Sequence, residues 1–501
     1  MESAKGKSPA KYLKPIMFVG TCSDAGKSII NTAFCRIFKQ DGYTPAPFKA
    51  QNMSLNSYST IEGGEMGRAQ VVQAEACCLP PHTDMNPVLL KPTDDKNSQV
   101  ILNGKPIGNL SAKEYFRMKE GKEELFKEAC LAFERLSAKY NPIVLEGAGS
   151  ISELNLKERD ITNMRMAIAA DASVFLVADI DRGGIFASVY GTIALLSSEE
   201  RSRIKGIIIN KFRGDDSLFA EGKAIIEKLT GIPVVGIIPW FNDIKIEEED
   251  SVVLDTKNRN IRENKINVAI ILLQRMSNFT DFDVLELDPR FNTFYTNRPE
   301  DLEKSDIIIL PGTKNTISDL MVIKNNGMAR AIIDAYKRGK KVIGICGGYQ
   351  MLGRRIEDPD YVEGKIPVVA GLGLLPVCTV IEKGKITKQS RFTFLPVYDN
   401  SCKGYEIHMG RTCITDEVEE KPVAVLEDGR RDGYYLNDRC WGSYLHGILD
   451  NNAALEHLAK GFDKQNERTS FDYESFKEEQ YNKLADLVRS HVNMEYIYSQ
   501  L

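Results

Sequence analysis

A short apolar strand that runs straight into a cysteine between glycines constrains the fold of this chain more than any other feature. Residues 341–345 end at Cys346, and Gly344 and Gly348 flank the cysteine two residues away on either side. Glycines at these places permit the sharp strand-to-helix turn that exposes a nucleophile at the edge of a parallel sheet. The helix that follows directs N–H groups and its positive dipole end at the sulfur, which favours thiolate. The pattern predicts an α/β domain with Cys346 as nucleophile rather than as a packed core residue.

A nucleophilic thiol needs a base, and the chain has five histidines. His446 precedes Gly447 in residues 442–447, which look like a strand end that opens into a loop. His408 also has glycine neighbours, in residues 404–410, and is the alternative base. The remaining three histidines occupy Pro-rich or amphipathic helical settings, where a solvated or packed ring is expected; they are His82, His457 and His491.

These residues resemble the class I, or triad, glutamine amidotransferases, which carry a G-x-C-x-G nucleophile motif and a histidine before a glycine. The resemblance implies that Cys346 attacks the side-chain amide of glutamine while His446 takes its proton and passes it to departing ammonia. Residues 310–313 match the oxyanion loop of that family. Backbone N–H groups near Gly312 and Gly347 are therefore expected to hold the tetrahedral oxyanion.

One position departs from the usual amidotransferase pattern. The family places a glutamate two residues after the histidine to orient it, and this chain has Ile448 there. Either another carboxylate, such as Asp450 or Glu406, orients the imidazole, or no carboxylate does. Amidotransferase domains of the cobyric acid synthase type lack this glutamate, so the departure narrows the family.

The N-terminal part of the chain carries a phosphate-binding pattern. An apolar strand at 16–20 leads into a loop that contains Gly26, Lys27 and Ser28, and a helical stretch follows. Loop N–H groups and the helix N-terminus can surround phosphates, the lysine can reach the β- and γ-phosphates, and the serine hydroxyl can ligate Mg²⁺. The strict pattern has glycine where this chain has Thr21. We expect this loop to bind ATP and Mg²⁺.

The form of the loop indicates which phosphate-binding group the chain resembles. Partition-type ATPases carry an extra lysine five residues before the main one, and that position is Cys22 here. The pattern G-T-x-x-x-x-G-K-[ST] is instead similar to the dethiobiotin-synthetase-like group, which activates carboxylates with ATP.

That resemblance assigns further residues. Glu146, at the end of an apolar run, resembles the glutamate that helps to bind Mg²⁺, and Asn210 resembles the adenine-reading end of the fold. Lys49 resembles the lysine that contacts the substrate carboxylate and the transferred phosphoryl group. The simpler synthetases place an acidic metal ligand soon after this lysine, where the chain has Gln51 and Asn52, so a third metal ligand stays unassigned.

Several segments rich in amide, Arg and Lys side chains suit an anionic substrate that bears amides; they are 49–56, 67–70, 73–75, 84–92 and 179–184. Together they resemble the cobyric acid synthase family over nearly the whole chain. The resemblance implies that adenosylcobyrinic acid a,c-diamide is amidated at its b, d, e and g propionates, with ATP and L-glutamine consumed. Two alternatives are the sister enzyme cobyrinic acid a,c-diamide synthase and a non-enzymatic P-loop ATPase switch with a vestigial amidotransferase domain.

Length and composition limit the remaining classes. A chain of 501 residues exceeds one domain. It shows no run of spanning length and no signal-peptide pattern, and its ten cysteines lack paired spacing, which together favour the reduced cytoplasm and no membrane partner. The net charge of −5 does not favour nucleic acid as a partner.

Strands that alternate with helical stretches predict two domains, each a mostly parallel sheet flanked by helices. The strands are expected at 16–20, 143–146, 174–179, 206–210 and 234–238, and then at 266–273, 306–310 and 342–345. We expect a P-loop synthetase domain at 1–250, a linker at 251–264 and an amidotransferase domain at 265–455. Residues 456–501 should form a helical tail that packs on the second domain.

Overall fold

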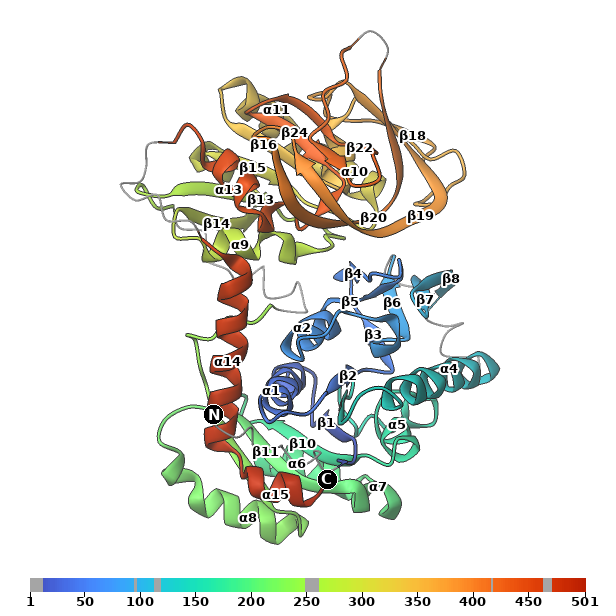
Figure 1. The fold of residues 1–501 in the computed structure, drawn as a ribbon, viewed down its shortest axis with the longest axis vertical. Coiled ribbons are helices and arrows are strands. Elements are labelled where there is room, and N and C mark those ends of the chain that lie inside the picture. The colour runs from blue at the N-terminus through green and yellow to red at the C-terminus, as the bar shows by residue number, and fades with distance from the viewer. Residues whose placement is uncertain (1–11, 94–96, 112–118, 248–260, 416–417, 463–470) are drawn as a thin grey trace, which may run out of the picture. The chain divides into compact units, whose positions relative to one another are not determined.

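A computed structural model describes residues 12–93, 97–111, 119–247, 261–415, 418–462 and 471–501. The chain forms two compact units (Figure 1). The first comprises Met1–Met53, Met66–Ile246 and Glu474–Leu501, and the second comprises Ser54–Glu65 and Glu247–Tyr473. Most of the predicted linker at 251–264 lies outside the described residues.

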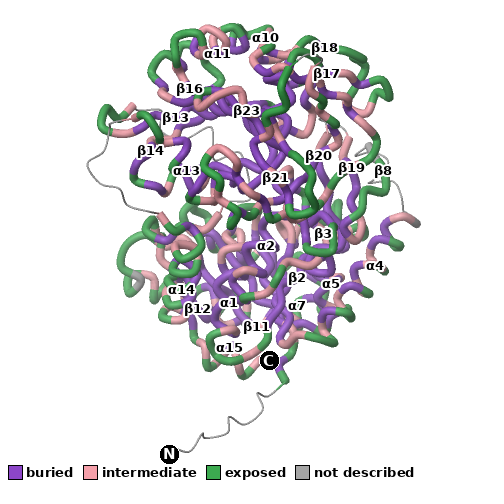
Figure 2. The backbone as a smooth tube through the Cα atoms, turned by 45° about the horizontal axis from the view of Figure 1, so that its top comes forward, coloured by how far each residue is buried: buried purple, intermediate pink, exposed green. Residues whose placement is uncertain are grey.

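The first unit is built on a six-stranded sheet in which all pairings are parallel. Its strands, in spatial order, are β12 (Val234–Pro239), β11 (Ile204–Phe212), β10 (Ser173–Asp179), β1 (Ile16–Gly20), β9 (Ile143–Glu146) and β2 (Ala46–Phe48). The five strands predicted for this half are confirmed. Continuous apolar runs are typical of parallel strands, because both faces of such a sheet are covered. Figure 2 shows buried backbone at the centre and exposed backbone on the outer elements.

Helices and a smaller sheet complete this unit. The helices are α1 (Lys27–Gln40), α2 (Arg68–Ala76), α4 (Lys119–Ser137), α5 (Met164–Ala169), α6 (Ile185–Ala194), α7 (Ser198–Arg203) and α8 (Ala220–Thr230), with short 3₁₀ turns η1 (Thr83–Met85), η2 (Lys157–Arg159) and η3 (Asp216–Phe219). A second sheet has the order β3 (Gln51–Met53), β6 (Val88–Pro92), β7 (Asn97–Leu102) and β8 (Lys105–Ser111).

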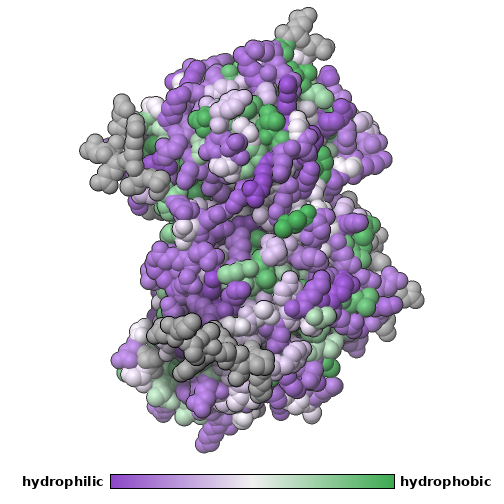
Figure 3. All heavy atoms as spheres, viewed as in Figure 1, coloured by the Kyte–Doolittle hydropathy of each residue, from purple (hydrophilic) through white to green (hydrophobic). Residues whose placement is uncertain are grey.

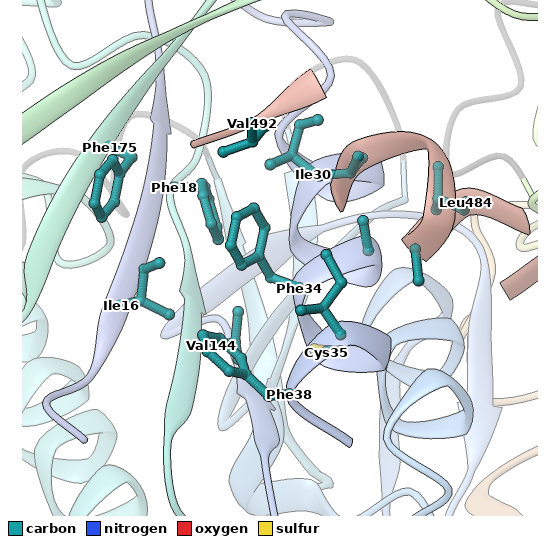
Figure 4. Close-up of a cluster of buried hydrophobic side chains, with 14 of the residues drawn as sticks. Ile16, Phe18, Ile30, Phe34, Cys35, Phe38, Val144, Phe175, Leu484 and Val492 are labelled. Carbon is teal, nitrogen blue, oxygen red and sulfur yellow. The ribbon is translucent and has the colours of Figure 1, made fainter. Parts of the chain in front are cut away.

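The described end of the C-terminal tail is helical, as predicted, but the expectation that the tail packs on the second domain is wrong for Glu474–Leu501, which belongs to the first unit. Its helices α14 (Tyr473–His491) and α15 (Met494–Ser499) contribute to the apolar core of the first unit. Leu484 and Val492 join the cluster that contains Phe18 and Phe34 (Figure 4). The tail is amphipathic, and amphipathicity shows that a face is buried without showing which neighbour buries it.

The second unit contains a six-stranded sheet that is parallel except for one edge strand. Its order is β14 (Phe291–Thr296), β13 (Ile266–Ile271), β15 (Ile307–Leu310), β16 (Lys341–Ile345), β24 (Cys440–Ser443) and β23 (Tyr434–Asn437). The three strands predicted for this half are confirmed. Its helices are α9 (Asp283–Leu287), α10 (Thr316–Asn325), α11 (Met328–Lys337), α12 (Gly347–Leu352) and α13 (Asn452–Ala459), with 3₁₀ turns η5 (Phe279–Phe282), η6 (Pro299–Lys304) and η7 (Ile448–Asp450).

A mostly antiparallel sheet, which the sequence did not predict, lies in the same unit. It has the order β18 (Val368–Ala370), β17 (Arg355–Glu357), β19 (Val377–Phe394), β20 (Asp399–Ile414) and β25 (Leu445–His446), and β21 (Ala424–Leu426) pairs with both β19 and β22 (Arg431–Asp432). The pairing of β20 with β25 sets Tyr405 opposite His446, so the sheet fixes the backbone of the predicted base.

A short hairpin departs from the predicted domain boundaries. Strand β4 (Ser57–Ser59) pairs with β5 (Glu65–Gly67), and residues 54–65 belong to the second unit although the flanking sequence belongs to the first. The first domain is therefore not the contiguous 1–250 that the sequence predicts.

Hydrophilic residues cover most of the described surface on the face in Figure 3. None of the described helices is both long and apolar enough to cross a membrane.

Candidate functional site

Cys346 occupies the sharp turn that the sequence predicts, between β16 and α12. Its backbone has φ 50° and ψ −109°, an unfavourable conformation for a residue with a side chain. A Cβ at Gly348 would lie 1.9 Å from the carbonyl oxygen of Leu310, and one at Gly344 would lie 2.7 Å from the backbone of Gly348. Only glycine therefore fits at the two flanking positions, and the turn holds the thiol at the carboxyl edge of the sheet.

His446 ends β25 and is almost fully buried. Its Nδ1 lies 2.6 Å from Oδ2 of Asp281, and the N–H of Gly447 donates to Oδ1 of the same carboxylate at 3.0 Å. The Cys346 side chain lies close enough to the imidazole to raise the pKa of His446, and its thiol donates to the carbonyl oxygen of Ile407 at 3.6 Å. Cys346, His446 and Asp281 thus lie in the spatial order of a catalytic triad, in which a thiol, an imidazole and a carboxylate follow one another.

The surroundings of His446 favour its charged form. Burial lowers the pKa of the imidazole, but the Asp281 carboxylate and the Cys346 sulfur outweigh burial and raise this pKa to about 10. The histidine is therefore an imidazolium at neutral pH. An imidazolium beside a cysteine stabilises the thiolate, which is the nucleophilic form.

Asp281, the carboxylate that contacts His446, was not singled out from the sequence. The sequence offered two other carboxylates to orient the imidazole, Glu406 and Asp450. Glu406 is paired with Arg430, whose Nη2 lies 2.6 Å from Oε2 of the glutamate. Asp450 follows the histidine in η7. Asp281 lies in the segment after β13, whereas the family pattern directs attention to residues after the histidine. The position of Asp281 after a predicted parallel strand was a usable signal, because the carboxyl ends of adjacent parallel strands meet at one edge of a sheet.

His408 has other partners than the nucleophile. Its Nδ1 lies 2.8 Å from the carbonyl oxygen of Gly410, and its Nε2 lies 3.5 Å from Glu406. The ring stacks on Tyr444 with centroids 3.8 Å apart. The geometry favours His446 as the base.

The predicted oxyanion loop also lies beside the turn. A Cβ at Gly347 would approach the backbone nitrogen of Thr313 to 3.1 Å, and one at Gly312 would approach Cε1 of His446 to 3.1 Å. The end of β15, the start of α12 and the imidazole therefore converge. This convergence is compatible with the prediction that the N–H groups of Gly312 and Gly347 bind a tetrahedral oxyanion.

The phosphate-binding loop of the first unit has the expected local form. Gly26 has φ 94° and precedes α1, and a Cβ there would lie 2.1 Å from Nδ2 of Asn210. That amide donates to the carbonyl oxygen of Ala25 at 2.9 Å, so Asn210 supports the loop. The ammonium of Lys27 is curled into the loop and donates to the carbonyl oxygens of Cys22, at 3.2 Å, and Gly149, at 3.0 Å. Because the Lys27 ammonium already lies in the loop, a change of side-chain rotamer is enough for it to contact a phosphate bound there.

Glu146 lies at the centre of the predicted metal and substrate residues. Its Oε1 accepts hydrogen bonds from the Ser28 hydroxyl, at 2.8 Å, and the Lys49 ammonium, at 2.9 Å, and its Oε2 accepts one from Gln73 at 2.5 Å. Burial alone raises the pKa of this carboxyl, but Lys49, Gln73 and Ser28 outweigh burial and lower it. The structure thus brings together three residues that the sequence places far apart, with an ionised carboxylate between them.

The donor set suits Mg²⁺ held together with phosphate. A hydroxyl and a carboxylate are the one or two protein ligands that Mg²⁺ typically takes beside substrate phosphates and water. Within the described residues no group of three or more His, Cys, Asp or Glu side chains could hold a metal alone. Asn52 bonds Gln70 at 3.0 Å and supplies no acidic ligand. Thr21 is buried in the loop, where its N–H donates to the carbonyl oxygen of Val177 at 3.1 Å.

Two family descriptions match the chain, one in each half. Residues 16–253 match the CobQ/CobB/MinD/ParA nucleotide binding domain, and residues 267–454 match the CobB/CobQ-like glutamine amidotransferase domain. The first half is therefore a nucleotide-binding domain and the second a glutamine amidotransferase domain.

Proteins named cobyric acid synthase are similar to the chain over almost its full length. The one from Parabacteroides distasonis is 73% identical over 98% of this chain and 99% of that protein. The one from Bacteroides fragilis is 58% identical over 98% and 99%, and the one from Syntrophobacter fumaroxidans is 48% identical over 97% and 98%. With both domains matched and these identities, the chain belongs to the cobyric acid synthase family of glutamine-dependent ligases.

Proposed function

We propose that the chain amidates the b, d, e and g propionates of adenosylcobyrinic acid a,c-diamide, with ATP as activator and L-glutamine as nitrogen donor. Membership of the cobyric acid synthase family supports the substrate. One observation carries the reaction class: a Cys346–His446–Asp281 constellation and a Lys27–Ser28–Glu146 constellation occur in the same chain. The first is suited to release ammonia, and the second to activate a carboxylate.

In the glutaminase half, Cys346 attacks the side-chain amide carbon of glutamine. N–H groups of Gly312 and Gly347 stabilise the oxyanion, and His446 gives its proton to the departing ammonia. A thioester remains on the sulfur. His446 then takes a proton from water, which attacks the thioester and releases glutamate. Asp281 keeps the imidazole oriented through these steps and stabilises its charged form before ammonia leaves and after water attacks.

In the synthetase half, Thr21, Gly26 and Lys27 bind the phosphates and Asn210 supports the adenine end of the site. Ser28 and Glu146 would hold Mg²⁺, which would neutralise phosphate charge. Lys49 binds the substrate carboxylate next to the transferred phosphoryl group. ATP supplies the phosphoryl group that converts the carboxylate into an acyl phosphate, and ammonia displaces the phosphate to form the amide.

The two activities are linked because ammonia is mostly protonated at neutral pH. Its release within the protein raises the effective concentration of the unprotonated nucleophile. We further propose a cytoplasmic location, where ATP and glutamine are available and Cys346 stays reduced.

Mass spectrometry of cobyrinic acid a,c-diamide incubated with the protein, ATP, Mg²⁺ and glutamine tests this function. Each amidation replaces OH by NH₂ and lowers the mass by about one unit, so four successive decreases are expected. Amidation of cobyrinic acid itself, with the diamide left unchanged, would indicate the sister enzyme. ATP hydrolysis without glutamine hydrolysis or any mass change would indicate a switch with a vestigial amidotransferase domain.

A further inference from the structure

The hairpin Ser54–Glu65 is a segment of the N-terminal half that packs within the amidotransferase unit. It follows β3 directly, contains β4 and the first residue of β5, and is followed by α2. Asn56, Ser57, Ser59 and Thr60 are all buried to within 1% of full burial. A hairpin of small polar residues buried this deeply must have specific hydrogen-bond partners, because unpaired polar groups in the interior are costly.

Those partners lie on the loop that precedes the triad carboxylate. The N–H of Ser57 donates to Oδ1 of Asn278 at 3.1 Å, and the N–H of Phe279 donates to Oδ1 of Asn56 at 3.2 Å. Each asparagine side chain thus accepts a hydrogen bond from the backbone N–H of the residue that follows the other asparagine. This reciprocal pair fixes the hairpin to the start of η5.

The fixed loop carries Asp281. The N–H of Asp281 donates to the carbonyl oxygen of Asn278 at 3.1 Å, and the Asp281 carboxylate meets His446. Asn278 has φ 53° and ψ 43°, a left-handed conformation that side-chain hydrogen bonds help to stabilise. The hairpin therefore holds the backbone from which Asp281 reaches the imidazole.

A second route runs through an aromatic ring. Tyr405 stacks on His446 with ring centroids 5.3 Å apart and planes 22° apart. The ring of Tyr58, in the hairpin, packs against the ring of Tyr405, with centroids 4.4 Å apart. Nδ2 of Asn278 donates to the Tyr405 hydroxyl at 3.3 Å. The ring face of the imidazole is thus held by Tyr405, which the hairpin contacts, and its Nδ1 by Asp281, whose loop the hairpin contacts through Asn278 and Phe279.

The hairpin is anchored to the antiparallel sheet of the same unit. Glu65 pairs with Lys385 of β19 and accepts a hydrogen bond from the Ser57 hydroxyl at 2.8 Å. Nε2 of Gln389 donates to the carbonyl oxygen of Ser59 at 2.9 Å. These contacts attach the hairpin to the sheet. A segment can position catalytic groups only when it is itself held in place in this way.

We propose that Ser54–Glu65 is a positioning element of the glutaminase, in which Asn56 and Ser57 hold the Asn278 loop so that Asp281 orients His446. The inference rests on the proposed glutaminase roles of Cys346 and His446. The amidotransferase site is then complete only with a segment that the synthetase half of the sequence supplies.

The test uses the full-length protein and the steady-state hydrolysis of glutamine. Asn56→Ala removes the acceptor of the Phe279 N–H. A small displacement of a catalytic group is expected to lower kcat about 10-fold, with the KM for glutamine and ammonia-dependent amidation close to wild type. Ile61→Ala, at the exposed hairpin turn, is the matched control and should retain wild-type kcat.

A double-mutant comparison shows whether Asn56 acts through Asp281. In an Asp281→Asn background, Asn56→Ala should cause no further loss of kcat, because the contact that it positions is already gone. Asn278→Gly is a second variant, since glycine adopts a positive φ readily, and it should reproduce the loss of Asn56→Ala.

Three outcomes would overturn the inference: wild-type kcat in Asn56→Ala and Asn278→Gly, the same fold loss in both backgrounds, or an equal loss of ammonia-dependent amidation. Failure of the proposed function gives a different result. In that case Cys346→Ser would retain glutamine hydrolysis, whatever the hairpin variants do.

Discussion

Replacement of Asp281 by asparagine removes the charge that faces His446 and changes little else. The side chain keeps its size, but an amide replaces the carboxylate that lies 2.6 Å from Nδ1 and also accepts the N–H of Gly447. The imidazolium would then be buried without its acidic partner. We expect a fall in glutamine hydrolysis and a change in its pH dependence.

The size of the change follows from the burial of the pair. Removal of one partner from a buried ion pair costs about 3–5 kcal/mol. Since one pKa unit corresponds to about 1.36 kcal/mol, the pKa of His446 should fall by about two to four units. From about 10 in the wild type, it would reach about 6–8. The wild-type imidazolium persists throughout the neutral range, whereas the variant loses it as the pH rises through this lower value.

The assay is kcat/KM for glutamine hydrolysis measured between pH 5 and about 10. The alkaline limb of the profile should move to lower pH by about two to four units, and the rate near pH 8 should fall on the order of 10²-fold. Asp450→Asn, a carboxylate close in sequence to the histidine, is the control and should keep the wild-type profile. An unchanged alkaline limb in Asp281→Asn, or a shift in Asp450→Asn alone, would refute the assignment of the orienting acid.

His446→Ala should lower glutamine hydrolysis on the order of 10²–10⁴-fold and spare ammonia-dependent amidation, while His408→Ala should be affected less; selective loss in the His408 variant would reverse the assignment of the base. Lys27→Ala should abolish amidation with either nitrogen donor and leave glutamine hydrolysis measurable, and normal ATP binding in isothermal titration would contradict the role of the loop. Glu146→Gln removes the buried carboxylate beside Ser28, so the Mg²⁺ concentration that gives half-maximal amidation should rise about 10-fold or more; an unchanged Mg²⁺ titration would exclude Glu146 as a ligand.

Local patterns in the sequence were sufficient to predict the sheets and most of the candidate site. The strand before Cys346 and the strand before Gly26 each combine a buried apolar run with glycines at fixed spacing. Such signals are short-range, because a strand, a turn and the next helix start lie within about ten residues. Parallel strand order brings the carboxyl ends of strands to one edge, as the approach of Gly347, next to Cys346, to Thr313 illustrates.

The elements that could not be predicted depend on contacts between distant parts of the chain. Asp281 reaches His446 across 165 positions of sequence, and its loop is held by Asn56 from the other half of the chain. The tail carries an apolar stripe that could pack on either unit, and Leu484 packs in the core of the first. A hydrophobic pattern specifies that a face is buried, whereas the partner is decided by tertiary packing.

The central claim is that glutamine nitrogen, released at Cys346, ends in the carboxamides of a corrin that the P-loop unit activates. Its most direct test is mass spectrometry of the corrin product made with amide-¹⁵N-glutamine, ATP, Mg²⁺ and an excess of unlabelled ammonium at neutral pH. The account predicts ¹⁵N in the new carboxamides with the wild-type protein, and only unlabelled carboxamides with Cys346→Ser. Unlabelled product from the wild type, or ¹⁵N-labelled product from Cys346→Ser, would contradict it.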